Sequence, residues 1–404
     1  MTRWILLMLA AAACGSSGSA DAPDAAPDVP PIVVQASDVP IAGLPSDDVT
    51  RFTDGDSLFG LPFRPADGLG PLFIRTSCEA CHREGSRGPG LVQKLAIVDA
   101  DGVTPAADQS ALPWGHTERP GMAAGATTPI TAPDVPGVKV TIRIGPPVFG
   151  RGYIEAVDDA ELLRVEAAQA GRSDAIHGRA NHTTFASVPN PDPTFGQLQT
   201  GQAVIGKLGL KARIATLDDF TADAYQGDMG MTTPMRPAEL PNPDGLTDDL
   251  SPGVDLAQDH IDRVAFYLRR IAIPLRVGLT DRGTALFAQV QCAACHVPSL
   301  RTRADYPIPQ LAGIDAPIYS DLLLHDMGPA LADGQTDGSA TPSAWRTAPL
   351  IGLRFAPTYL HDGRVTTVTD AVLAHDGEAA GSRTAFQALS SDDQRALIDF
   401  VSAL

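Results

Sequence analysis

The strings Cys78-Glu79-Ala80-Cys81-His82 and Cys292-Ala293-Ala294-Cys295-His296 decide how this chain folds, and both have the pattern C-x-x-C-H. This pattern is typical of covalent attachment of a c-type haem. Two thiols three positions apart can each add to a haem vinyl group, and the next imidazole then lies beneath the iron. The sequence therefore predicts two covalently bound haem c groups. The predicted attachment residues and proximal ligands are Cys78, Cys81 and His82 for one haem and Cys292, Cys295 and His296 for the other.

Two other uses of a C-x-x-C pair explain these strings less well. A structural zinc ribbon places its two pairs about 15–20 residues apart, whereas these pairs lie in different halves of the chain. Neither a zinc site nor a thioredoxin-like dithiol requires a histidine directly after both second cysteines. The two strings use four of the five cysteines, so no disulfide framework is available.

The fifth cysteine, Cys14, ends a segment with a small positive start and an apolar stretch. Residues 1–13 are therefore predicted to be a secretion signal, too short to span a bilayer. Small residues directly before a cysteine resemble bacterial lipoprotein signals, in which that cysteine becomes the lipidated first residue. Ordinary cleavage at an A-x-A site is the alternative. Both predict export, to the periplasm or to the outer membrane as an anchored lipoprotein.

The following segment, residues 14–48, repeats Asp-Ala-Pro and Asp-Val-Pro elements without helical or strand periodicity. We expect a disordered acidic tether, although an ordinary disordered terminus fits the composition equally well. The rest of the chain is longer than one hydrophobic core usually organises. Because each half carries one C-x-x-C-H string, the sequence predicts two haem domains, over residues 49–273 and 274–404.

Apolar periodicity is clearest in the second half. Residues 281–290 and 392–404 are predicted helices that bracket a small cytochrome c-like domain, and residues 256–271 form another helix before Pro274. In the first half, residues 138–144 alternate like a half-buried strand, and residues 158–170 have helical spacing. The predicted fold is mainly α, with two cytochrome c-like haem domains, the first enlarged by long loops and a few β-strands.

The net charge of −18 limits the partners. With no cluster of Lys and Arg, it argues against nucleic acid and against an anionic membrane surface, and it favours a basic or neutral electron-transfer protein. Membrane contact is expected only through the lipid anchor. No phosphate-binding glycine loop, nucleophile elbow or H-E-x-x-H motif is present.

The sixth coordination position of each iron separates an enzyme from an electron carrier, because an open position lets peroxide bind. Met327 is the predicted distal ligand of the second haem, since it follows His296 within the same small domain. Packing in the core is the alternative role for a methionine. His361 precedes a turn-forming Asp-Gly pair and is predicted to act near a haem face as ligand, gate or proton donor. A structural histidine before a turn is its alternative reading.

Four segments resemble the bacterial di-haem oxidoreductase family, whose members are described as peroxidases and as thiol oxidoreductases. The segments are residues 227–233, 319–328, 344–350 and 359–364. The likeness extends from about Phe59 to Leu404. The family is distantly related to di-haem cytochrome c peroxidases and to a di-haem enzyme that matures a tryptophan-derived quinone in another protein.

This resemblance implies a division of labour between the haems. The N-terminal haem would activate hydrogen peroxide, and the C-terminal haem, with Met327, would relay electrons from a small c-type cytochrome or cupredoxin. Related peroxidases also bind calcium, although this chain has no recognisable calcium loop. A non-catalytic electron-transfer cytochrome and a protein-modifying di-haem oxidase remain alternatives.

Peroxide cleavage needs a group that moves a proton between the two oxygens, and a carboxylate with a pKa raised by burial suits this role. Glu155 lies in an otherwise apolar stretch and is the predicted group. A solvated glutamate near a helix start is the alternative.

Overall fold

The computed structural model describes residues 38–404 apart from residues 124 and 248–252. The predicted signal peptide and most of the predicted tether lie outside this part of the chain. The described residues belong to a single unit by their contacts. The division into two domains at residue 274 therefore remains a prediction. No helix in the described part is long and apolar enough to cross a membrane.

Helices account for 32% of the described residues and strands for 15%, in agreement with the prediction of a mainly helical fold. The helices are α1 Ser46–Gly60, α2 Arg151–Ala156, α3 Asp159–Ala170, α4 Leu217–Met229, α5 Gln258–Arg270, α6 Asp281–Gln289, α7 Val368–Leu373, α8 Ala380–Gln387 and α9 Ser391–Ser402. The predictions over 158–170, 256–271, 281–290 and 392–404 are confirmed as α3, α5, α6 and α9.

The strands form five two-stranded antiparallel sheets within the described residues. The strands are β1 Leu72–Phe73, β2 Leu91–Ile97, β3 Gly121–Met122, β4 Val138–Ile144, β5 Asn181–Thr184, β6 Ala203–Gly206, β7 Leu300–Arg301, β8 Asp315–Ala316, β9 Leu324–Asp326 and β10 Ala344–Arg346. The pairs are β1 with β3, β2 with β4, β5 with β6, β7 with β8 and β9 with β10. The strand predicted over residues 138–144 is confirmed as β4.

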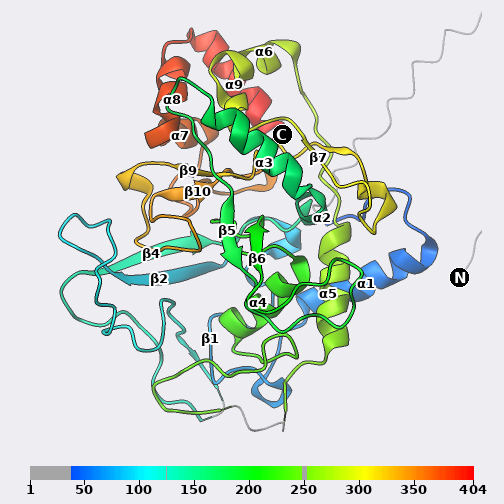
Figure 1. The fold of residues 1–404 in the computed structure, drawn as a ribbon, viewed down its shortest axis with the longest axis vertical. Coiled ribbons are helices and arrows are strands. Elements are labelled where there is room, and N and C mark those ends of the chain that lie inside the picture. Colours follow the sequence, from blue (N-terminus) through cyan, green and yellow to red (C-terminus); the bar gives the residue numbers. More distant parts are fainter. Residues whose placement is uncertain (1–37, 124, 248–252) are drawn as a thin grey trace, which may run out of the picture. The chain divides into compact units, whose positions relative to one another are not determined.

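Helix α5 packs against both α1 and α4 in the lower half of Figure 1. Helix α1 crosses α5 at Gly55, where a Cβ atom would lie 2.4 Å from the backbone oxygen of Arg263. Only glycine allows this approach, so the two helices touch backbone to backbone. Order begins before the predicted end of the tether, because Ile41 is buried and its amide donates to Arg270 O at 2.8 Å.

The C-terminal helices form a separate apolar core at the top of Figure 1. Helices α6 and α9 cross at Gly283, where a Cβ atom would lie 2.4 Å from the Cβ of Phe400. Phe287 and Leu397 are buried beside this crossing. This core carries the second C-x-x-C-H string, which directly follows α6.

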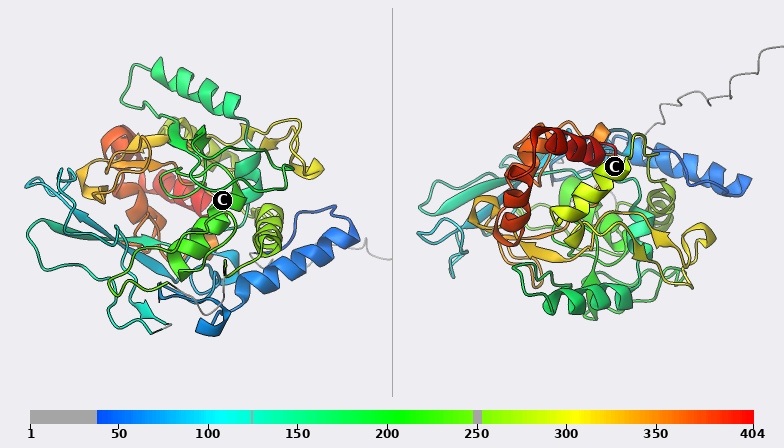
Figure 2. Two further views of the ribbon diagram at one scale, coloured as in Figure 1. Left: turned by 60° about the horizontal axis from the view of Figure 1, so that its bottom comes forward. Right: turned by 90° about the horizontal axis from the view of Figure 1, so that it is seen from above.

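Segments of the first half also pack against the second half. Helix α3 lies along the edge of the C-terminal half in the views of Figures 1 and 2, and the side-chain amide of Gln169, near its end, donates to Ala294 O at 3.0 Å. The backbone of Arg179 pairs with Leu324 of β9. The loop around the second string is therefore held from both halves of the chain.

Candidate haem centres

The first string forms a loop after β1, and His82 is fixed in it by a distant carbonyl. The ring atom Nδ1 lies 2.6 Å from Pro146 O. Because a carbonyl oxygen can only accept, Nδ1 carries the proton and Nε2 is left as the basic nitrogen. Burial lowers the pKa of His82 to about 4, with the charge of Arg151 adding to the effect. A neutral imidazole with Nε2 available is what an iron ligand requires.

The second string repeats this arrangement with different partners. The Nδ1 atom of His296 donates to Tyr319 O at 3.1 Å, which again leaves Nε2 as the basic nitrogen. Burial, together with the charge of His375, lowers the pKa of His296 to about 4. Both predicted proximal histidines are thus oriented and neutral.

The four cysteines of the two strings are free thiols in the structure. Burial raises the pKa of Cys78 and of Cys292 to about 12 and that of Cys81 to about 11. They are therefore protonated thiols, the form that adds across a vinyl group. Together with the two oriented imidazoles, this donor set fits two haem c groups. The predicted attachment residues remain a prediction, but the residues around them suit it.

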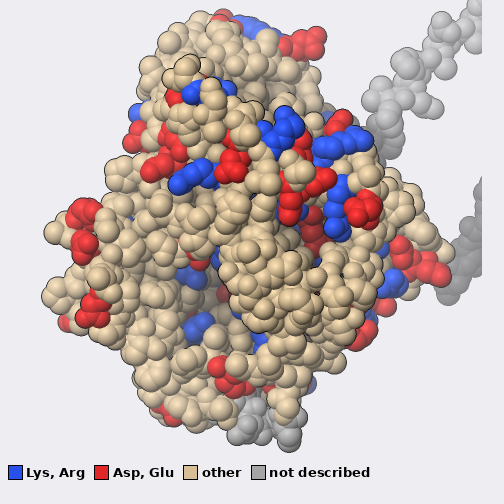
Figure 3. Space-filling model, viewed as in Figure 1, with Lys and Arg blue, Asp and Glu red and all other residues tan. Residues whose placement is uncertain are grey.

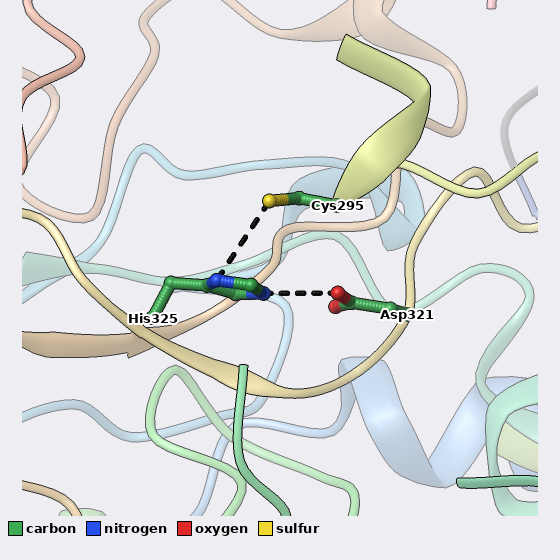
Figure 4. A group of neighbouring side chains, drawn as sticks. All are labelled: Cys295, Asp321 and His325. Carbon is green, nitrogen blue, oxygen red and sulfur yellow. Dashed lines mark hydrogen bonds and ion pairs between the residues drawn. The ribbon is translucent and has the colours of Figure 1, made fainter. Parts of the chain in front are cut away.

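A charged side-chain group lies beside Cys295 (Figure 4). His325 Nδ1 is 3.7 Å from Cys295 Sγ and 2.7 Å from a carboxylate oxygen of Glu378, while its Nε2 is 2.9 Å from Asp321 Oδ2. Burial would lower the pKa of His325, but the hydrogen bonds to Asp321, Cys295 and Glu378 outweigh it and raise this pKa to about 12. The imidazole is therefore a fixed cation, and the side-chain amide of Gln169 also donates to Asp321 at 2.7 Å.

Cys295, Asp321 and His325 are also the one group of at least three metal-ligating side chains that converge within the described residues. Calcium prefers six to eight oxygen ligands, and this group offers a thiol, an imidazole and one carboxylate. It gives no support to the expected calcium ion.

His375 is a further histidine of the C-terminal half, and it is not among the site residues predicted from the sequence. Its Nδ1 donates to Ala371 O at 2.7 Å, so its Nε2 is the basic nitrogen, as in His296. Its charge acts on His296, which places the two imidazoles near each other. A signal was present in the sequence, because His375-Asp376-Gly377 repeats the His-Asp-Gly of His361-Asp362-Gly363.

The two other predicted residues near the haems, Met327 and His361, have different surroundings. Met327 is half-buried after β9, and its amide donates to Ser343 O at 2.9 Å. His361 stacks on Trp345 with ring centroids 3.8 Å apart and planes 15° apart. Burial lowers the pKa of His361 to about 4, so its ring is neutral. The distal role of Met327 and the catalytic role of His361 both remain predictions.

The pKa prediction for Glu155 is wrong. Its carboxylate accepts from Arg269 at 2.7 and 2.9 Å, from the Tyr306 hydroxyl at 2.6 Å and from the Leu217 amide at 2.7 Å. Burial raises its pKa, but the charge of Arg269 and these hydrogen bonds prevail and lower it. Arg269 also binds Asp218 at 2.6 and 3.0 Å. Glu155 therefore belongs to a buried ion-pair network and lacks the raised pKa expected of a proton shuttle.

Asp228, near the first string, has the raised pKa that was expected of Glu155. Burial raises the pKa of Asp228 to about 6, with the charge of Asp223 adding to the rise. The charges of Lys94, Arg213 and Arg119 oppose it. On the face of the molecule drawn in Figure 3, Lys and Arg side chains lie recessed in a hollow, at the place where Figure 1 draws β2. The surroundings of the first string are thus charged.

A family model described as "Di-haem oxidoreductase, putative peroxidase" matches residues 133–404. Similar solved structures include a hydrazine synthase of Kuenenia stuttgartiensis, with 14% identity, a TM-score of 0.40 and coverage of 92% of this chain and 90% of that chain. A MauG-like protein associated with microbial copper homeostasis has 15% identity, a TM-score of 0.42 and coverage of 91% and 92%. The di-haem peroxidase BthA of Burkholderia thailandensis has 14% identity, a TM-score of 0.38 and coverage of 87% and 85%. No curated protein sequence matches.

Proposed function

Because the chain belongs to the di-haem oxidoreductase family, we propose that it reduces hydrogen peroxide to water at its first haem with electrons that enter through its second. The observation that carries this proposal is the pair of neutral, oriented imidazoles, His82 and His296, each directly after a C-x-x-C pair. The iron of a bound haem supplies the redox chemistry and the binding position for peroxide.

The protein holds each haem in the same way in this proposal. Cys78 and Cys81 would form thioether bonds to the first haem, and Cys292 and Cys295 would form them to the second. The carbonyl oxygens of Pro146 and Tyr319 fix the rings of His82 and His296, respectively, and the Nε2 atom of each ring would bind an iron. Such a hydrogen bond also raises the basicity of the ligand nitrogen.

The surroundings support assigning the reactive role to the first haem. Asp228 and several basic side chains lie near the first string, and proton transfer and peroxide binding need such polar groups. Near the second string lies a further neutral imidazole, His375, whose pKa burial lowers. Ligation by a second side chain would close that iron to peroxide and leave it to relay electrons. We therefore assign the distal position of the second haem to His375, with Met327 as the competing ligand.

The electron donor in this proposal is a small redox protein, a c-type cytochrome or a cupredoxin. The site of action is outside the cytoplasm, with Cys14 as the lipidated residue of an anchored lipoprotein. Radiolabelled palmitate incorporation that is lost in Cys14→Ser is the expected result. Secretion of an unlabelled wild-type protein would instead indicate ordinary signal cleavage.

Rapid-mixing absorption spectroscopy tests the catalytic proposal. The half-reduced protein is mixed with hydrogen peroxide, and a reduced small cytochrome is then added. Fast loss of the ferrous signal followed by catalytic oxidation of the donor is expected. A spectrum that peroxide leaves unchanged would indicate a non-catalytic electron carrier. Reaction with peroxide without oxidation of any small donor would point to oxidation of a protein substrate.

A further inference from the structure

His325 lies on β9, and its imidazole contacts a sulfur of the second string (Figure 4). The Nδ1 atom is 3.7 Å from Cys295 Sγ, the atom that would form a thioether bond to the second haem. The imidazole side chain is buried, with 3% of its surface exposed. Charges and hydrogen bonds next to a haem are among the features that set its reduction potential.

Both ring nitrogens of His325 face carboxylates. Nδ1 is 2.7 Å from Glu378 Oε2, and Nε2 is 2.9 Å from Asp321 Oδ2. Each carboxylate also accepts from a backbone amide, Glu378 from Asp326 at 3.0 Å and Asp321 from Leu323 at 3.0 Å. Because an ionised carboxylate can only accept, both nitrogens of the ring must donate. His325 is therefore a cation that is held between two carboxylates beside the sulfur.

The same network fixes the peptide that carries Cys295. The Asp321 amide donates to Cys295 O at 2.8 Å, and the Asp321 carboxylate accepts from the side-chain amide of Gln169 at 2.7 Å. At Gly178 a Cβ atom would lie 2.6 Å from the His325 ring, so the chain lies directly against the imidazole. The position of the imidazole relative to the Cys295 sulfur is thus fixed by hydrogen bonds and by packing.

We propose that His325 is a positioning residue of the second haem, and that its charge, balanced between Asp321 and Glu378, sets the potential at which this haem accepts electrons. This inference rests on the proposed function and deepens it, because it names the residues that regulate the relay. In the relay step the iron takes one electron from the small redox protein and passes it to the first haem. The charge of His325 does not change in this step.

The sign of the effect follows from the charge of the haem. A ferric haem carries one more positive charge than a ferrous haem. A nearby cation therefore favours the ferrous form and raises the potential, whereas a nearby carboxylate favours the ferric form and lowers it. Such effects are stronger in the protein interior, where the effective dielectric constant is lower than in water.

The test measures the reduction potential of each haem in the holoprotein by spectroelectrochemical titration, with electron paramagnetic resonance to distinguish the two ferric haems. His325→Gln removes the cation, and Glu378→Gln removes one carboxylate. Arg236→Gln is the matched control, because Arg236 is a cation held between Asp219 and Asp223 of α4 at 2.9 and 3.0 Å.

His325→Gln should lower the potential of the second haem, because two uncompensated carboxylates favour the ferric form. Glu378→Gln should raise it, because His325 then keeps Asp321 as its single carboxylate partner. Each shift should be about tenfold in the reduction equilibrium, or about 59 mV for a one-electron couple. His325→Lys restores a cation and should return the potential toward the wild-type value, and Arg236→Gln should leave it unchanged.

A purely structural role predicts a different pattern, because loosening the loop should shift the potential in the same direction in His325→Gln and Glu378→Gln. Shifts of the same sign, or unchanged potentials in both variants, would overturn the inference. An equal shift in Arg236→Gln would also overturn it. If His325→Gln does not fold, Glu378→Gln decides the question, because 15% of the Glu378 side chain is exposed and a potential that fails to rise contradicts the proposed role.

The potentials are measured without peroxide, which separates this inference from the proposed function. A wild type with two haems that does not react with peroxide, but shows the expected shifts in the variants, would overturn peroxide reduction and support the role of His325. A wild type that reacts with peroxide, with potentials that neither variant changes, would overturn the role of His325 alone. A second string that attaches no haem would overturn both.

Discussion

The two C-x-x-C-H strings have nearly the same sequence but very different surroundings. The first follows a two-residue strand, lies near charged groups such as Asp228 and Lys94, and contacts Gly90, where a Cβ atom would be 2.3 Å from Cys81 Sγ. The second follows α6 and packs on an apolar core that includes Phe287 and Phe400. A pentapeptide thus specifies attachment of the cofactor, while the surrounding fold specifies what the cofactor can do.

The helices that pack near the two strings, which we call the first and second scaffolds, are also stabilised by different interactions. Behind the first, Arg269 is buried between Glu155 and Asp218. Behind the second, aliphatic and aromatic side chains of α6 and α9 meet without buried ion pairs between these two helices among the described residues. The first scaffold should therefore respond to changes of charge and pH, and the second to changes of side-chain volume.

The largest effect is expected from removing one pair of thiols at a time. Cys78→Ala with Cys81→Ala should yield protein with one haem and no peroxide reaction, because the reactive centre is lost. Cys292→Ala with Cys295→Ala should also carry one haem, but its remaining centre should still bind peroxide without sustained turnover. Intact mass and haem content measured after denaturation check this. Equal loss of peroxide binding in both variants would remove the functional distinction between the strings.

Glu155→Gln should destabilise the protein by about 3–5 kcal/mol, because it leaves the charge of Arg269 incompletely neutralised in the interior. The matched control is the pair of Glu161 with Arg164, whose guanidinium is exposed at the surface, and Glu161→Gln should cost less than about 1 kcal/mol. Chemical denaturation of the holoproteins measures both.

The lowered pKa of Glu155 also predicts how the stability of the protein depends on pH. The pKa of Glu155 is lower in the folded protein than its ordinary value of 4.5. Its contribution to stability is therefore present above pH 4.5 and is lost as the pH falls through the folded pKa. The acid unfolding of Glu155→Gln should be less steep in this range, and an unchanged profile would show that the ion pair is not a source of acid sensitivity.

Leu397→Ala should destabilise the second scaffold by about 2–4 kcal/mol through loss of buried apolar volume in α9. In contrast to Glu155→Gln, the change should be nearly independent of pH between 4 and 7. Its effect on the spectrum should be confined to the second haem. Denaturation curves at several pH values decide this, and a strong pH dependence would contradict the apolar account of this core.

His375→Ala should change stability least but alter the second haem most specifically. If His375 is the distal ligand, its removal converts that haem from six- to five-coordinate, which absorption and electron paramagnetic resonance spectra detect. Met327→Leu should leave both spectra unchanged. The reverse outcome, with a spectral change only in Met327→Leu, would restore the prediction made from the sequence.

Local patterns allowed much of this protein to be predicted without a structure. The two strings, strand β4 and helices α3, α5, α6 and α9 each depend on residues close together in the chain, so alternation and helical spacing were sufficient. The resemblance to di-haem oxidoreductases also depended on short segments, and the family model over residues 133–404 confirms it.

The partners of the site residues could not be predicted in this way, because they come from distant segments. Glu155 looked like an isolated buried acid until Arg269, 114 residues away, was placed against it. His82 is oriented by Pro146, 64 residues further along the chain. Burial and charge at a point depend on everything folded around it. The sequence by itself therefore determined where haem can be attached. Only the tertiary structure decided that Glu155 is ion-paired with Arg269 and has a lowered pKa, whereas burial raises the pKa of Asp228.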